Sequence, residues 1–164
     1  MKIIKALCIS AACEILCLFI AFTLAGSQMM FMRVLSAVCT TGILVCIMGS
    51  NAAKTASADR KQERIQKRSA DRIMTALSSL ASSAVNIISW AVLYITHSRG
   101  EDFYRWHKLL NAPFFQIYNI IEPSASSNSL SGAEISAMLP LSFVPAAVYI
   151  TAYLLSYKGM LHSD

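Results

Sequence analysis

An acidic residue inside an apolar segment is the feature of this sequence that most directly suggests chemistry. Glu14 is the one charged residue in the run from residue 6 to residue 26. An ionisable side chain is costly to hold in lipid, so Glu14 is a candidate site for a proton or a cation. The alternative is a structural role, in which a protonated Glu14 hydrogen-bonds to Thr40 or Thr41, or to another helix, and holds the protein together.

A glutamate in the first apolar run resembles, in that single feature, the small multidrug-resistance transporters. The resemblance implies a proton- or cation-binding carboxyl group at Glu14. The rest of the chain departs from that family, because it is longer and carries a large polar segment between its third and fourth apolar runs.

Other kinds of chemistry are not indicated. No nucleotide-binding, zinc-protease or serine-hydrolase signature occurs. The five cysteines show neither a C-x-x-C pair nor metal-ligand spacing, and the three histidines lie outside the apolar runs or at their ends, which excludes a haem held between facing helices. We therefore predict no catalytic residue, no metal and no cofactor.

Four long apolar runs must position Glu14, and they determine the fold class. The chain has 164 residues, of which 55% are hydrophobic and 14% are charged; an average soluble domain has about 25% charged residues. A helix of about 20 apolar residues spans a bilayer. We predict an all-α integral membrane protein with one domain, a four-helix bundle made of two helical hairpins, whose spans are residues 6–26, 29–49, 73–96 and 137–157.

The first apolar run has a second interpretation. Lys2 and Lys5 precede it, and Ala25, Gly26 and Ser27 follow its core, so residues 1–27 also fit a cleaved signal peptide. The run is longer than the usual apolar region of such peptides, and it contains Glu14. Both features favour a retained span.

Basic residues indicate the orientation of the spans. Residues 54–72 hold seven of the fourteen Lys and Arg residues, so the positive-inside rule predicts a cytoplasmic connector, with both termini cytoplasmic in a multi-pass protein of the cell membrane. This rule also accounts for the net charge of +5 without nucleic acid. The connector could contact anionic lipid headgroups or a cytoplasmic partner through Arg60, Lys61, Arg64, Lys67 and Arg68.

The third run carries small and polar residues at helical spacing. Ser78 with Ser82, and Ser79 with Ser83, form small-xxx-small pairs, which allow helices in lipid to approach closely. Asn86 follows near the middle of this span, where its amide needs a partner on another helix.

The segment 97–136 is expected outside the cytoplasm. Its apolar residues recur at steps of three and four, which predicts an amphipathic helix lying in the membrane interface; they are Phe103, Trp106, Leu110, Phe114 and Ile117. Pro113 should break this helix in two. A re-entrant dip of residues 112–121 is the alternative, and neighbouring helices would have to cover its backbone.

The last span has clear local signals. Ser131 and Glu134 match a capping box, so the helix should begin at about Gly132. Pro140 and Pro145 should kink it.

Two functions fit these features. The first is an accessory or structural subunit of a larger membrane assembly, whose partners are the lipid bilayer and another membrane protein or a second copy. The small-residue face, the amphipathic segment and the lack of catalytic motifs favour it. The second is a small transporter or channel that uses Glu14, and an enzyme is a more distant third.

Overall fold

The computed structural model describes residues 2–25, 30–66, 72–124 and 126–159. Helices make up the regular structure of these ranges, and no strand occurs in them. The prediction of an all-α protein is therefore confirmed. The reason is the sequence itself, in which long apolar stretches satisfy most of their backbone hydrogen bonds within each stretch by forming helices.

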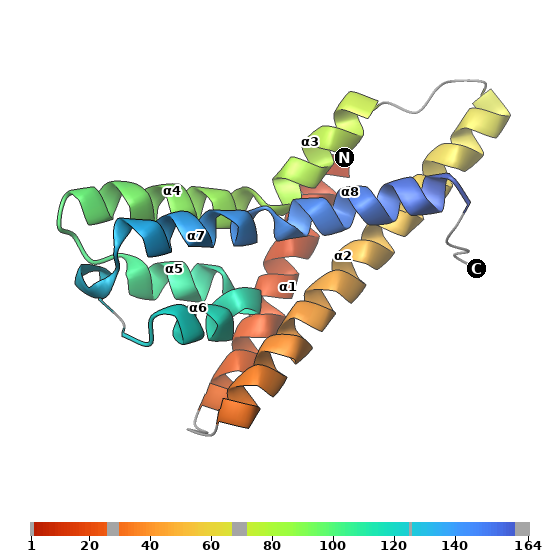
Figure 1. Cartoon of the computed structure of the whole chain (residues 1–164). Helices are drawn as coiled ribbons and strands as arrows, with labels where there is room; N and C mark the ends of the chain where they lie inside the picture. Colours follow the sequence, from red (N-terminus) through yellow and green to blue (C-terminus); the bar gives the residue numbers. More distant parts are fainter. Residues whose placement is uncertain (1, 26–29, 67–71, 125, 160–164) are drawn as a thin grey trace.

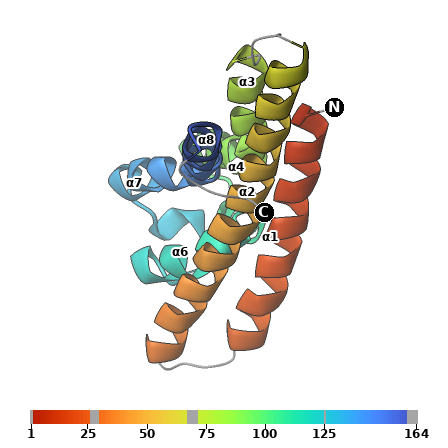
Figure 2. The same ribbon diagram turned by 90° about the vertical axis from the view of Figure 1, so that its right-hand side faces the viewer.

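Two long helices, α1 (Lys2–Ala25) and α2 (Met30–Gln66), lie antiparallel to each other (Figures 1 and 2). Helix α2 does not end with its apolar run but continues into the basic connector. This extension follows from the lack of glycine and proline between Asn51 and Gln66. The first part of the connector is thus a rigid continuation of the second apolar run.

The third apolar run was expected as one span, but the structure divides it into α3 (Arg72–Ser82) and α4 (Ala84–Ser98), bent by 57° at Ser83. Serine hydroxyls cause the break, because they compete for the backbone groups of the helix. Ser82 Oγ donates to the Ser79 carbonyl at 2.6 Å, and Ser10 Oγ of α1 donates to the Ser82 carbonyl at 2.7 Å.

The last apolar run is also broken. Helix α7 (Gly132–Ser142) begins where the capping box of Ser131 predicted, and α8 (Val144–Tyr157) follows after Phe143. Two prolines, Pro140 and Pro145, flank this break and remove backbone donors from the helical ladder.

The two breaks meet in space. Ser83 Oγ accepts a hydrogen bond from the Ala146 N–H at 2.8 Å, and Ser79 Oγ donates to the Ala146 carbonyl at 3.2 Å. The serine-rich face of α3 therefore packs inside the chain, against α1 and α8.

Between α4 and α7 the chain forms a helical hairpin. Its parts are α5 (Tyr104–Leu110), the 3-10 turn η1 (Ala112–Phe114) and α6 (Phe115–Ile121), and a second short turn, η2 (Ser127–Ser129), precedes α7. Pro113 sits in η1, so the predicted break at this proline is confirmed. The tip of the hairpin points at the α1–α2 pair and contacts both helices (Figure 1).

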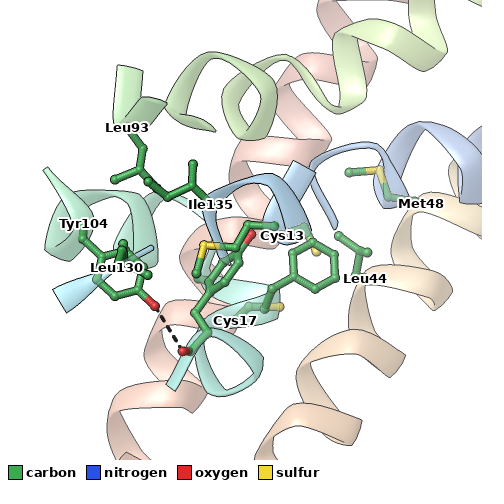
Figure 3. Close-up of a cluster of buried hydrophobic side chains, with 12 residues drawn as sticks. Cys13, Cys17, Leu44, Met48, Leu93, Tyr104, Leu130 and Ile135 are labelled. Atoms are coloured by element: carbon green, nitrogen blue, oxygen red, sulfur yellow. Dashed lines mark hydrogen bonds between the residues drawn. The ribbon is translucent and has the colours of Figure 1, made fainter. Parts of the chain in front are cut away.

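The apolar core lies where the hairpin, α4 and α7 meet α1 and α2. Cys13 and Cys17 of α1 and Leu44 of α2 pack there with Tyr104 and Ile135 (Figure 3). A smaller cluster joins α1, α2 and α8. In it, Tyr149 and Tyr153 of α8 pack with Ala6 of α1 and with Ala52 and Ala56 of α2.

Three stretches are long and apolar enough to cross a membrane, namely α1, α2 and the nearly continuous α7–α8 stretch Gly132–Tyr157, and the bent α3–α4 pair makes a fourth if it is one span. Large apolar side chains on α1 and α2 face outwards; Phe19 is 68% exposed and Phe31 is 73% exposed. Such a surface is typical of contact with lipid.

We expect Ser83→Ala to destabilise the protein by about 1–3 kcal/mol, because it leaves the buried Ala146 N–H without a partner. Thermal unfolding in mild detergent measures the effect. Ser98→Ala is the matched control, since Ser98 is exposed and bonds only within its own helix. Equal melting temperatures for the two variants would contradict this account of the helix breaks.

Candidate functional site

Glu14 lies halfway along α1 and faces the tip of the hairpin. Its side chain is buried, with 8% of its surface exposed. Glu14 Oε2 accepts a hydrogen bond of 2.9 Å from the backbone N–H of Ala112. Next to it, Thr40 of α2 donates from Oγ1 to the Pro113 carbonyl at 2.8 Å.

Of the partners that the sequence offered to Glu14, the structure shows neither Thr40 nor Thr41 but groups on other elements of the chain. The hairpin tip lies between α1 and α2 and forms hydrogen bonds with Glu14 of α1 and Thr40 of α2. The physical reason is that the chain turns at Ala112 and Pro113, where backbone groups lose their helical partners and need others. Thr41 is half-buried and makes no hydrogen bond to Glu14.

Asn86 approaches Glu14 from α4. It is fully buried, and its amide lies close enough to interact with the Glu14 carboxyl group. Neither polar atom of Asn86 forms a hydrogen bond of normal geometry with a described residue, and Glu14 Oε1 forms none either. The sequence therefore identified two polar residues that the fold brings together.

The hairpin adds three further buried polar residues that the sequence did not single out. His107 Nδ1 lies 2.9 Å from Ser89 Oγ, and Asn111 Nδ2 donates to the same hydroxyl at 3.2 Å. The rings of His107 and Tyr118 lie 5.0 Å apart.

Three other polar atoms of the hairpin form no hydrogen bond with a described residue. They are His107 Nε2, Asn111 Oδ1 and the Tyr118 hydroxyl. We call Glu14, Asn86, His107, Asn111 and Tyr118 the polar cluster.

The hairpin is held at its open end by a buried lysine. Lys108 Nζ donates to Asn119 Oδ1 at 2.9 Å and to the carbonyls of Glu122 and Ser124 at 2.8 and 2.7 Å. It thus satisfies carbonyls left free where α6 ends. In the loop nearby, hydrogen bonds from the N–H and hydroxyl of Ser127 hold the pKa of Asp102 below its usual value.

The expected interfacial residues do not share one face. Trp106 and Leu110 are exposed, at 59% and 42%, whereas Phe114 is in the core and Phe103 and Ile117 are half-buried. The polar side of α5, with His107 and Lys108, is the side that is buried. A polar side can face inwards here because other parts of the hairpin and α4 supply its hydrogen bonds.

The remaining predicted residues form no hydrogen bond with Glu14. Ser78, Ser79 and Ser82 of α3 and the following Ser83 are buried, while Arg60, Lys61 and Arg64 are exposed on the extension of α2. Lys67 and Arg68 lie outside the described residues.

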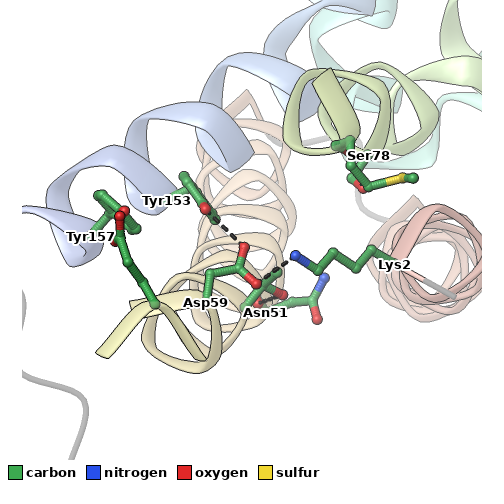
Figure 4. Close-up of polar contacts among 9 residues, drawn as sticks. Lys2, Asn51, Asp59, Ser78, Tyr153 and Tyr157 are labelled. Carbon is green, nitrogen blue, oxygen red and sulfur yellow. Dashed lines mark hydrogen bonds and ion pairs between the residues drawn. The ribbon is translucent and has the colours of Figure 1, made fainter. Parts of the chain in front are cut away.

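A second polar group at the end of α2 was not predicted. Asp59 is only 4% exposed; it forms an ion pair with Lys2 and accepts a hydrogen bond from the Tyr153 hydroxyl at 2.8 Å (Figure 4). Tyr157 likewise bonds to Glu63. The spacing of the tyrosines along α8 was the available signal, but nothing in the sequence indicated which residues they would contact.

We expect Glu14→Leu to lower the free energy of unfolding by about 1–3 kcal/mol, because it leaves the Ala112 N–H without an acceptor. Glu14→Gln should stay within about 0.5 kcal/mol of the parent, since the Gln carbonyl can accept the same hydrogen bond. Thermal melts in detergent compare the three proteins. A Gln variant as unstable as the Leu variant would contradict the role given to this bond.

The function has to be inferred from this geometry, because no family model, no curated protein and no solved structure matches the chain. Within the described ranges, no group of three His, Cys, Asp or Glu side chains could hold a metal ion. The polar cluster offers both donors and acceptors, so it could bind a proton or a small cation with Glu14 as the anionic member.

Proposed function

We propose that this chain is a small multi-pass membrane transporter or channel in which Glu14 binds a proton or a small cation. One observation carries the proposal. Glu14 lies in an apolar helix with one carboxyl oxygen unpaired, and the other members of the polar cluster also hold unpaired atoms in the protein interior.

The hydrogen bond from the Ala112 N–H does not by itself explain why residue 14 carries a carboxyl group. One neutral acceptor would satisfy that N–H, and a carboxyl group is expensive in an apolar helix. Each unpaired buried polar atom in the cluster costs about 1–3 kcal/mol if it binds nothing. Unpaired groups of this kind are rare in proteins, and a bound water or ion is one of the usual reasons for them.

The surrounding backbone supports the same function. Two broken helices, α3–α4 and α7–α8, meet at Ser83 and Ala146, and a helical hairpin ends at Glu14. In membrane transporters, irregular backbone at membrane depth is tolerated where it lines a binding site. In this proposal the hairpin is re-entrant, because Glu14 is 12 residues from Lys2, or about 18 Å along α1, near the middle of a core about 30 Å thick.

An accessory subunit was the other function that the sequence suggested. One of its three supports was the small-residue face of the third apolar run. That face packs against α1 and α8 of the same chain, so this support no longer argues for an external partner.

Proteoliposomes that contain the purified protein and a trapped pH-sensitive dye test the proposal. A proton or potassium gradient should drive flux through the parent protein, and Glu14→Gln should abolish it because an amide can neither release a proton nor attract a cation. Glu101→Gln makes the same change at an exposed loop residue and should keep full activity.

The melting temperature of each variant shows whether it is folded. A Glu14→Gln protein that is folded and fully active would refute the proposal. So would parent vesicles that conduct protons, sodium and potassium no faster than empty ones.

The proposed topology places the basic connector in the cytoplasm and the loop before α7 outside. Cysteines introduced at Gln62 and Asn128, both exposed, should therefore react with a membrane-impermeant maleimide from opposite sides of the cell membrane. The parent protein, whose cysteines lie in apolar runs, gives the background. Labelling of both introduced cysteines from the same side would contradict this topology.

A further inference from the structure

A groove runs along the surface between α1 and α2, at the end of the pair that holds Lys2. It consists of two adjoining pockets of about 530 and 580 Å³. The pockets share Lys5, Asn51 and Lys54, so they form one continuous depression between helices that lie side by side (Figure 2).

The upper part of the groove is positively charged. Lys2, Lys5 and Lys54 line it together with one acid, Asp59. Lys2 is already paired with Asp59 (Figure 4). Lys5 and Lys54 are exposed and form no hydrogen bond or ion pair with a described residue, so two positive charges remain uncompensated at the groove.

The lower part of the groove is apolar. Ile9, Ala12 and Leu16 line one side, and Cys46 and Ile47 line the other. From Lys2 to Leu16 the groove follows 14 residues of α1, or about 21 Å at 1.5 Å per residue. The hydrocarbon part of one leaflet is about 15 Å deep. The groove is thus long enough for an acyl chain and for the headgroup above it.

We propose that this groove binds one anionic phospholipid, with its phosphate between Lys5 and Lys54 and an acyl chain along Ala12 and Leu16. The charged end fits the headgroup, and the apolar length fits the chain. A free phosphate would use only the upper end, where two flexible lysines in water hold an anion weakly. The inference shares with the proposed function only the location in a membrane, and it makes no use of Glu14.

Native mass spectrometry of the full chain in detergent tests this site. Phosphatidylglycerol should bind in preference to phosphatidylcholine. The double variant Lys5→Gln and Lys54→Gln should weaken phosphatidylglycerol binding by about thirty-fold, from the usual contribution of a basic residue near an anionic lipid. The matched pair Arg99→Gln and Arg105→Gln removes the same charge from exposed positions that do not line the groove, and it should bind as the parent does.

Two further measurements test the contributions of the acyl chain and the headgroup separately. Ala12→Phe fills the apolar groove without changing any charge and should also abolish phosphatidylglycerol binding. Glycerol 3-phosphate, which has the anionic head but no acyl chain, should not compete. Melting curves without lipid show that each variant is folded.

Other outcomes would overturn the inference. Equal loss in the two charge pairs would mean diffuse attraction to the net positive charge of the protein. Equal binding of the two lipids, full binding by Ala12→Phe, or effective competition by glycerol 3-phosphate would each exclude a groove that holds both headgroup and chain. These results are independent of the flux assay, so failure of one proposal is distinguishable from failure of the other.

Discussion

The buried backbone at the tip of the hairpin is the constraint on which the rest of this structure depends. Pro113 ends the helical ladder, and the Ala112 N–H and the Pro113 carbonyl must find partners away from water. Glu14 supplies the acceptor and Thr40 the donor, from two different helices. Their hydrogen bonds fix the tip between α1 and α2, and this position brings His107, which the sequence placed outside the membrane, into the interior next to Tyr118.

The same constraint explains why serines stand at the helix breaks. A broken helix frees N–H and carbonyl groups, and a serine is small enough to approach them closely while its hydroxyl can donate or accept. Ser83 and Ser79 bind both backbone groups of Ala146, and Ser10 binds the carbonyl of Ser82. The backbone groups of Ala146 and the Ser82 carbonyl are therefore bonded, although the buried Ser142 hydroxyl at the end of α7 has no partner among the described residues.

Local signals in the sequence predicted the local structure. The apolar runs predicted the helices, Ser131 predicted the start of α7, and Pro113 predicted the break in the outer segment. Long-range pairing was not predictable, because Glu14 and Ala112 are 98 residues apart and any buried donor would have suited the carboxyl group. For a similar reason, the sequence did not show that the polar side of α5 is buried. Its polar residues find their hydrogen-bond partners on other elements, such as α4 and α6.

The hydrogen bonds also bear on why position 14 holds a glutamate rather than a glutamine. The Ala112 N–H requires only an acceptor, which a neutral side chain offers at a lower desolvation cost. What a carboxyl group adds is the capacity to exchange a proton or to attract a cation, and its second oxygen is the atom that offers this capacity. That oxygen forms no hydrogen bond of normal geometry, and the buried Asn86 amide lies close enough to interact with the carboxyl group. An amide can both donate and accept, so Asn86 can accompany either protonation state of Glu14.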